Sequence, residues 1–110
     1  MQLTGLLEDA RRAAPDSRIL LRDPIAAFGP RALASVTPWL EDPVLSAFAV
    51  RVILRVGEQG DPATAASLLR RARTQVPEGV RGDVSWALER LRLAGPRRAP
   101  APARASARAR

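Results

Sequence analysis

The chain has 110 residues, of which 46% are hydrophobic and 26% charged, and its formal net charge is +7. This length predicts one domain, and no apolar run approaches the ~20 residues that a membrane-spanning helix needs. The absence of cysteine, histidine and lysine excludes disulfides, the usual zinc ligands and a Schiff-base lysine.

All 18 basic residues are arginine, and alanine and proline are abundant. This bias is typical of a GC-rich genome, so an arginine alone does not indicate a binding site. The N-terminus lacks the basic start and the long apolar stretch of a signal peptide. We therefore expect a bacterial protein that stays in the cytoplasm and does not enter a membrane.

The first predicted helix spans about residues 2–14. Its apolar residues recur at the i, i+3, i+4, i+7 spacing of a single helical face, and they are Leu3, Leu6, Leu7 and Ala10. Glu8 and Arg12 are four residues apart and can pair on the outer side of this helix.

Helix starts are indicated by Asp-Pro dipeptides, because Asp accepts hydrogen bonds from free N–H groups and Pro suits the first helical position. Three of them recur at intervals of 19 residues, at Asp23-Pro24, Asp42-Pro43 and Asp61-Pro62. The equal spacing favours helix starts over simple turns. Helix ends are predicted where a glycine follows an apolar residue, at Gly29, Gly57 and Gly95.

These signals predict an all-α domain in which short connections make consecutive helices antiparallel. Pro24 would break one helix and Pro38 would kink the next, because a proline ring clashes with the preceding turn. No β-strand pattern persists. The predicted helices after the first span residues 18–28, 30–40, 43–57, 62–75 and 80–94.

The 43–57 helix is apolar on nearly all sides, and only Arg51 and Arg55 are charged within its body. Such a helix is buried on most sides, so we place it at the centre of the fold. One of its apolar stripes consists of Leu45, Phe48, Ala49, Val52 and Val56, and the other of Ala47, Val50 and Leu54.

A shift of 38 residues aligns this central helix with the last predicted helix, so that apolar residues coincide at helical spacing. The aligned pairs include Phe48 with Trp86, Ile53 with Leu91, and Gly57 with Gly95. Self-similarity at a fixed period is the mark of repeat proteins, in which helix pairs bury their apolar faces by stacking.

Residues 29–57 resemble one HEAT-type helical repeat, with a proline-containing first helix, an Asp-bearing turn and an Ala-rich second helix that ends in an apolar-Gly pair. The residues that carry the resemblance are Val36, Pro38, Leu40, Asp42, Ala47, Ala49 and the Val56-Gly57 pair. A weaker copy covers residues 62–95. The family often has an Arg in the first turn of the second helix, but Val44–Ala47 contains none.

The resemblance extends over residues 19–95 and implies a short right-handed stack of antiparallel helix pairs, a HEAT-like α-solenoid fragment. It also implies that the N-terminal helix caps the stack and that the protein is a scaffold for binding other proteins.

No residue pattern predicts an active site. Without histidine or cysteine, the usual base for an activated nucleophile is absent, and neighbouring carboxylates on a helix point in different directions. Helix capping explains Asp23, Asp42 and Asp61 better than catalysis does. We therefore expect a protein that is not an enzyme and has no catalytic, cofactor or metal site.

Trp39 and Trp86 are each candidates for either an exposed anchor or a core residue. The alignment with Phe48 favours the core for Trp86. Core packing is also the favoured place for Trp39, but because this residue lies near a turn we retain it as a possible partner contact.

Arg70, Arg71 and Arg73 form a cluster on the exposed side of the 62–75 helix, beside Leu68 and Leu69. The cluster can contact an acidic partner or phosphate, or it can simply be a solvated face.

Residues 1–95 hold 13 Arg and 11 acidic residues, whereas residues 96–110 hold five Arg and no acid. Residues 96–110 contain only Ala, Pro, Arg and one Ser, so we expect a helical-repeat domain at 1–95 and a disordered basic tail at 96–110. The tail is either a nucleic-acid contact or a passive extension, and its arginines are Arg97, Arg98, Arg104, Arg108 and Arg110.

The leading functional hypothesis is a non-enzymatic helical-repeat module that mediates protein–protein interaction. The alternative is a nucleic-acid-associated protein that uses the Arg-rich tail and the Arg70–Arg73 face.

Overall fold

A computed structural model describes residues 2–98 of the chain, with side chains placed as far as residue 93. Every regular element in this range is helical, which confirms the predicted all-α class. The α-helices are α1 (Leu3–Arg12), α2 (Pro15–Arg18), α3 (Arg22–Ala26), α4 (Pro30–Val36), α5 (Ser46–Gln59), α6 (Pro62–Ala72) and α7 (Arg81–Arg98). Three short 3₁₀-helices are η1 (Ile19–Leu21), η2 (Thr37–Glu41) and η3 (Glu78–Val80).

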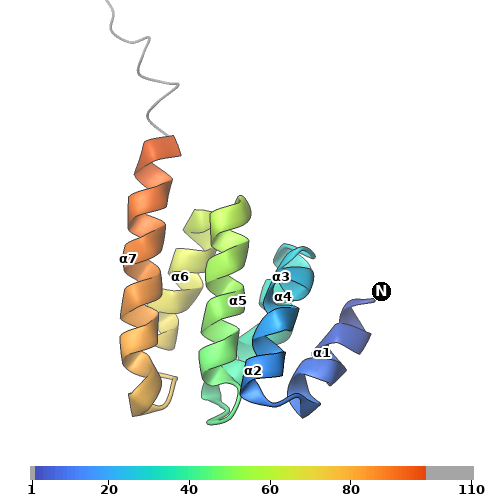
Figure 1. The fold of residues 1–110 in the computed structure, drawn as a ribbon. Coiled ribbons are helices and arrows are strands. Elements are labelled where there is room, and N and C mark those ends of the chain that lie inside the picture. Colours follow the sequence, from blue (N-terminus) through green and yellow to red (C-terminus); the bar gives the residue numbers. More distant parts are fainter. Residues whose placement is uncertain (1, 99–110) are drawn as a thin grey trace, which may run out of the picture.

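Helix α5 lies at the centre, as its nearly uniform apolar surface predicts. It packs against α3, α4, η2, α6 and α7. Consecutive helices α5, α6 and α7 run in alternating directions in Figure 1. Both apolar stripes of α5 are covered, and its buried residues are Ser46, Phe48, Ala49, Val50, Val52, Ile53, Leu54, Val56 and Gly57.

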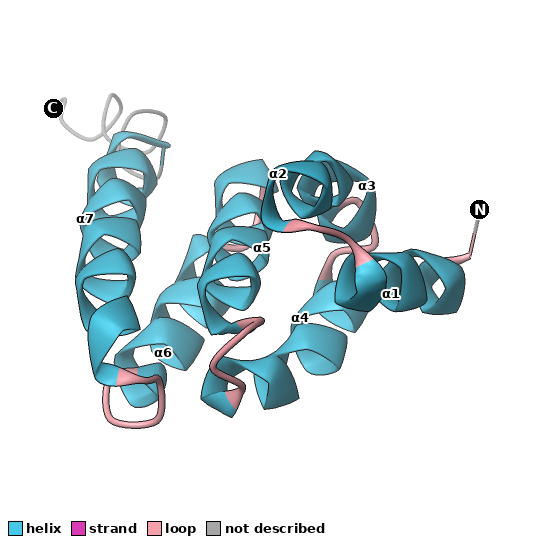
Figure 2. Ribbon diagram, turned by 60° about the horizontal axis from the view of Figure 1, so that its bottom comes forward, coloured by secondary structure: helices cyan, strands magenta, loops and turns pink. Residues whose placement is uncertain are grey.

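The helices form two rows when the molecule is turned as in Figure 2. One row contains α7, α5 and the α2–α3 segment, and the other contains α6, α4 and α1. None of the helices in residues 2–98 combines the length and the apolarity that crossing a membrane requires.

The predicted 18–28 helix is divided into α2, η1 and α3, and the expected helix start at Asp23 is wrong. Helix α3 begins one residue earlier, at Arg22, and its start has no side-chain cap. The Asp23 carboxylate instead receives the Nε–H of Arg22 at 2.9 Å and lies 3.2 Å from Arg55 Nε. A tertiary ion pair therefore replaces the local capping role at this position.

Of the other two Asp-Pro dipeptides, Asp61-Pro62 does mark a helix start, whereas Asp42-Pro43 forms a turn ahead of α5 and the helix start predicted there is wrong. Asp61 caps α6, because its Oδ1 accepts from the Thr64 N–H at 3.4 Å. Asp42 Oδ1 accepts from the N–H groups of Val44 at 2.7 Å and Leu45 at 3.2 Å. This hydrogen-bonded turn leads into α5, whose first residue is Ser46.

Gly29 separates α3 from α4 with a φ of 65°, a conformation that favours glycine. The helix ends predicted at the other two glycines are wrong. Gly57 lies buried inside α5, which continues to Gln59, and α7 continues past Gly95 to Arg98. The predicted kink at Pro38 corresponds to the change from α4 to the 3₁₀-helix η2.

A chain of ion pairs links α3, α5 and α7. Arg55 bridges Asp23 and Glu58, with its NH1 group 3.6 Å from the Glu58 carboxylate. Glu58 also accepts from Arg90 of α7 at 2.6 Å and 3.1 Å. The hydrogen bond from Arg22 and the charges of Arg22 and Arg55 hold the pKa of Asp23 below its ordinary value.

Candidate functional site

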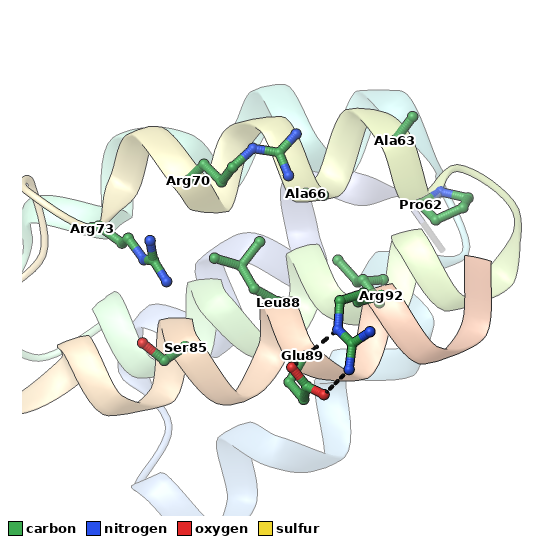
Figure 3. Close-up of a pocket in the computed structure, with 10 residues that line it drawn as sticks. Pro62, Ala63, Ala66, Arg70, Arg73, Ser85, Leu88, Glu89 and Arg92 are labelled. Atoms are coloured by element: carbon green, nitrogen blue, oxygen red, sulfur yellow. Dashed lines mark hydrogen bonds and ion pairs between the residues drawn. The ribbon is translucent and has the colours of Figure 1, made fainter. Parts of the chain in front are cut away.

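A groove of about 560 Å³ lies between α6 and α7. Its apolar surface comes from small and aliphatic residues, among them Ala66, Leu88 and Leu91. In Figure 3, Leu88 projects from α7 towards α6, on the side where Arg70 and Arg73 extend from α6. The groove is also lined by Pro62, Ala63, Ser85, Glu89 and Arg92.

The charges around this α6–α7 groove are unequal. Arg92 is paired with Glu89, with 2.5 Å between Arg92 NH2 and Glu89 Oε2. The hydrogen bond from Arg92 lowers the pKa of Glu89. Arg70 and Arg73 are exposed and have no ion-pair partner within residues 2–93. These two guanidinium groups therefore remain available to an anionic group in the groove.

The structure divides the predicted arginine cluster between two flanks of α6. Arg70 and Arg73 line the α6–α7 groove, whereas Arg71 lines a smaller hollow with Thr37, Leu40 and Leu68. Adjacent residues on a helix point about 100° apart, so three arginines close in sequence do not form one surface.

The two tryptophans differ in burial, although core packing was the favoured prediction for both. Trp39 is only 8% exposed and packs against Phe48, with 6.3 Å between the ring centroids, so it is not an exposed partner contact. Trp86 is 45% exposed, and its expected place in the core is wrong. Phe48 lies on the central helix α5, which neighbouring helices cover. Helix α7 packs against the other described helices on one side only, so Trp86, at the aligned position, is exposed.

Two arginines lie against the exposed Trp86. The guanidinium carbons of Arg51 from α5 and Arg90 from α7 are each 5.3 Å from the centroid of the indole ring. Both distances are within the range of cation–π attraction. Arg90 also donates a hydrogen bond to Glu58, which fixes its position. The Trp86 ring therefore contacts both Arg51 and an arginine that is held in place.

A second groove, of about 450 Å³, lies between the α2–η1 segment and α5, and sequence reasoning did not find it. It has three arginines and no carboxylate among its lining residues, which are Pro15, Arg18, Ile19, Arg22, Val44, Ala47, Phe48 and Arg51. Arg51 was seen in the sequence only as a charge on the central helix. The partners that make this groove come from segments more than 20 residues apart, so no local pattern could have indicated it.

Arg18, which lines this α2–α5 groove, is only 7% exposed. Its Nε–H donates to the Ala10 carbonyl at 2.7 Å and its NH2 group donates to the Ala13 carbonyl at 2.6 Å. These carbonyls belong to the end of α1, where no backbone N–H follows to pair with them. Arg18 therefore closes α1 and holds it against α2.

The described side chains contain no cluster of three acidic residues placed to hold a metal ion. Among the described residues, Glu89 is the one carboxylate that lines the α6–α7 groove. The predicted nucleic-acid contacts cannot be placed, because the side chains of Arg97 and Arg98 and the whole of Arg104, Arg108 and Arg110 lie outside the described residues.

Comparison of the chain with protein-family models, with curated proteins and with solved structures finds no match. A functional assignment therefore rests on this chain's own residues and surfaces.

Proposed function

We propose that this protein is a non-enzymatic helical-repeat module that binds an acidic protein partner in the α6–α7 groove. The observation that carries the proposal is the apolar floor around Leu88 beside Arg70 and Arg73, two cations without an ion-pair partner within residues 2–93. An amphipathic helix suits this groove, because its apolar stripe can cover Leu88 while its carboxylates reach the arginines.

The alternating directions of α5, α6 and α7 and the two rows of helices support a HEAT-like stack. In this proposal, α4 with η2 and α5 form one unit, and α6 with α7 form the next unit of a right-handed stack. The α6–α7 groove would then lie on the last layer, where a further unit or a partner can pack.

Charge reversal at the groove tests the proposal. Partners captured from the host by the full-length protein are identified by mass spectrometry, purified and titrated calorimetrically against variants. The double variant Arg70→Glu, Arg73→Glu is expected to weaken binding at least about tenfold, since each arginine supplies charge-assisted hydrogen bonds.

The matched control is Arg11→Glu, Arg31→Glu, which changes the net charge equally at two exposed arginines away from the groove. This control is expected to retain nearly full affinity. Equal losses in the two double variants would mean that overall charge, rather than the α6–α7 groove, governs binding, and would contradict the proposal.

The second candidate function is association with nucleic acid, which the five arginines and no acid in residues 96–110 favour. If all five contact phosphates, affinity for a DNA duplex should fall about 10²–10³-fold between ~50 and ~200 mM salt. Replacing the five with Gln should remove this salt dependence. Unchanged binding of the duplex after the replacement would exclude residues 96–110 as the nucleic-acid contact.

A further inference from the structure

The α2–α5 groove has a one-sided charge. Arg22 and Arg51 line this groove together with the buried Arg18, and none of the described residues that line it is a carboxylate. Arg22 donates its Nε–H to Asp23, whereas Arg51 has no ion-pair partner among residues 2–93. An anion that enters the groove therefore meets at least one cation with unused N–H donors.

Arg51 is positioned before any ligand arrives. The Trp86 ring attracts its guanidinium face at 5.3 Å, and Arg90, itself bonded to Glu58, lies at the same distance from that ring. A cation–π contact uses the face of the guanidinium and leaves the N–H groups at its edge free for a carboxylate. Such positioning reduces the entropy lost on binding.

Apolar surface adjoins these cations. Val44 is 65% exposed and lines the groove beside Ile19 and Ala47. Trp86, also exposed, contacts Arg51, which is one of the residues that line the groove. Tryptophan and arginine are the residues most enriched among those that dominate protein–protein binding energy. The surface is thus suited to a peptide with both acidic and aliphatic side chains.

We infer that the α2–α5 groove is a second docking site, separate from the α6–α7 groove, for an acidic segment of a partner protein. One aliphatic side chain of the segment covers Val44 and Ala47, and the flanking carboxylates bind Arg51 and Arg22. The chain's own residues 96–110 do not suit this role, because they carry five arginines and no acid. A nucleic acid is disfavoured as the ligand, because the guanidinium groups of Arg51 and Arg90 already lie over the Trp86 ring, where a base would have to stack.

Fluorescence of the full-length protein can test this inference, because the chain has only two tryptophans. In the Trp39→Phe variant Trp86 is the sole indole, so its emission reports on Arg51. The probe is a synthetic peptide in which Asp and Glu flank a central Leu. We expect a saturable change in Trp86 emission that weakens at high salt, and no change with the matching Asn/Gln peptide.

Substitutions then locate the site. Arg51→Gln should weaken the peptide affinity about tenfold or more, whereas Arg70→Gln with Arg73→Gln should leave it unchanged. Circular dichroism of each variant checks that the fold is retained, and Arg22→Gln gives an independent measurement at the same groove.

Three outcomes would overturn the inference. A peptide affinity that depends on Arg70 and Arg73 but not on Arg51 would place binding in the α6–α7 groove, and would leave the proposed function intact. Equal binding of the uncharged peptide would remove the role of the carboxylates. A single-stranded oligonucleotide that displaces the peptide at Arg51 with higher affinity would identify the surface as a nucleic-acid site.

Discussion

Gly57 of α5 and Leu91 of α7 are so close that a β-carbon on Gly57 would lie 2.7 Å from Leu91 Cδ2. The same β-carbon would lie 2.8 Å from the β-carbon of Ala65 in α6. Gly57 therefore allows three helices to meet, which is a packing role rather than the helix-ending role that its sequence context predicts.

Replacing Gly57 with alanine should destabilise the protein by about 1–3 kcal/mol, because the added methyl group overpacks this contact. Urea unfolding followed by circular dichroism measures the change. Gly82→Ala is the matched control, since Gly82 is also helical and a β-carbon there would meet none of the described residues within 4 Å. The control should be neutral or stabilising by up to ~1 kcal/mol, because alanine favours helix more than glycine does. Similar losses in both variants would show that close packing is not the cause.

Phe48 fills the centre of the fold against Trp39. We expect Phe48→Ala to cost about 3–5 kcal/mol, through lost burial and the cavity that remains. The same substitution at the half-buried Phe28 should cost clearly less. Thermal unfolding of the two variants compares them, and an unchanged midpoint for Phe48→Ala would contradict the central position of α5.

Arg18 closes the end of α1 through its bonds to the Ala10 and Ala13 carbonyls. Its replacement by Met keeps the aliphatic bulk but leaves these carbonyls without their donor. We expect a loss of roughly 1.5–3 kcal/mol in chemical unfolding. Arg11→Met, at an exposed arginine of the same helix, should change stability by less than ~0.5 kcal/mol. A negligible effect at Arg18 would mean that water replaces its donors without cost.

Ser46 is completely buried, and its hydroxyl has no hydrogen-bond partner among the residues that the structure describes. Ser46→Ala removes this unsatisfied group, so it should stabilise the protein by about 0.5–1 kcal/mol. Ser67→Ala, on the exposed face of α6, serves as the comparison. A higher unfolding midpoint for the Ser46 variant alone supports the prediction, and a lower one would reveal a partner for the hydroxyl.

Asp23 should make stability depend on acid pH. Its pKa is lowered in the folded protein by the hydrogen bond from Arg22 and by the charges of Arg22 and Arg55. A carboxyl with a lowered folded pKa stabilises the protein above its ordinary pKa of 3.8, and this contribution disappears as the pH falls through the folded value. The difference in unfolding midpoint between pH 6 and pH 3 should therefore shrink in Asp23→Asn, whereas Asp9→Asn should keep the wild-type difference. The same slope in all three proteins would refute the role of Asp23.

Much of the secondary structure follows from local chemistry and was predictable. The cap at Asp61, the kink at Pro38 and the interruption between helices at Gly29 depend on hydrogen bonds and backbone preferences of a few neighbouring residues. The central position of α5 also follows from its own residues, because a helix that is apolar on nearly all sides must be covered on nearly all sides.

Burial at single positions, in contrast, depends on which distant segments cover them. Phe48 and Trp86 align in the sequence. Trp39 of η2 covers Phe48, whereas Trp86 stays exposed. Asp23 has the capping signature of Asp61 but pairs with Arg55, and Arg71 separates from its neighbours through helical rotation alone. The α2–α5 groove likewise exists only after α2 and α5 are packed together, because its cations and apolar residues are far apart along the chain.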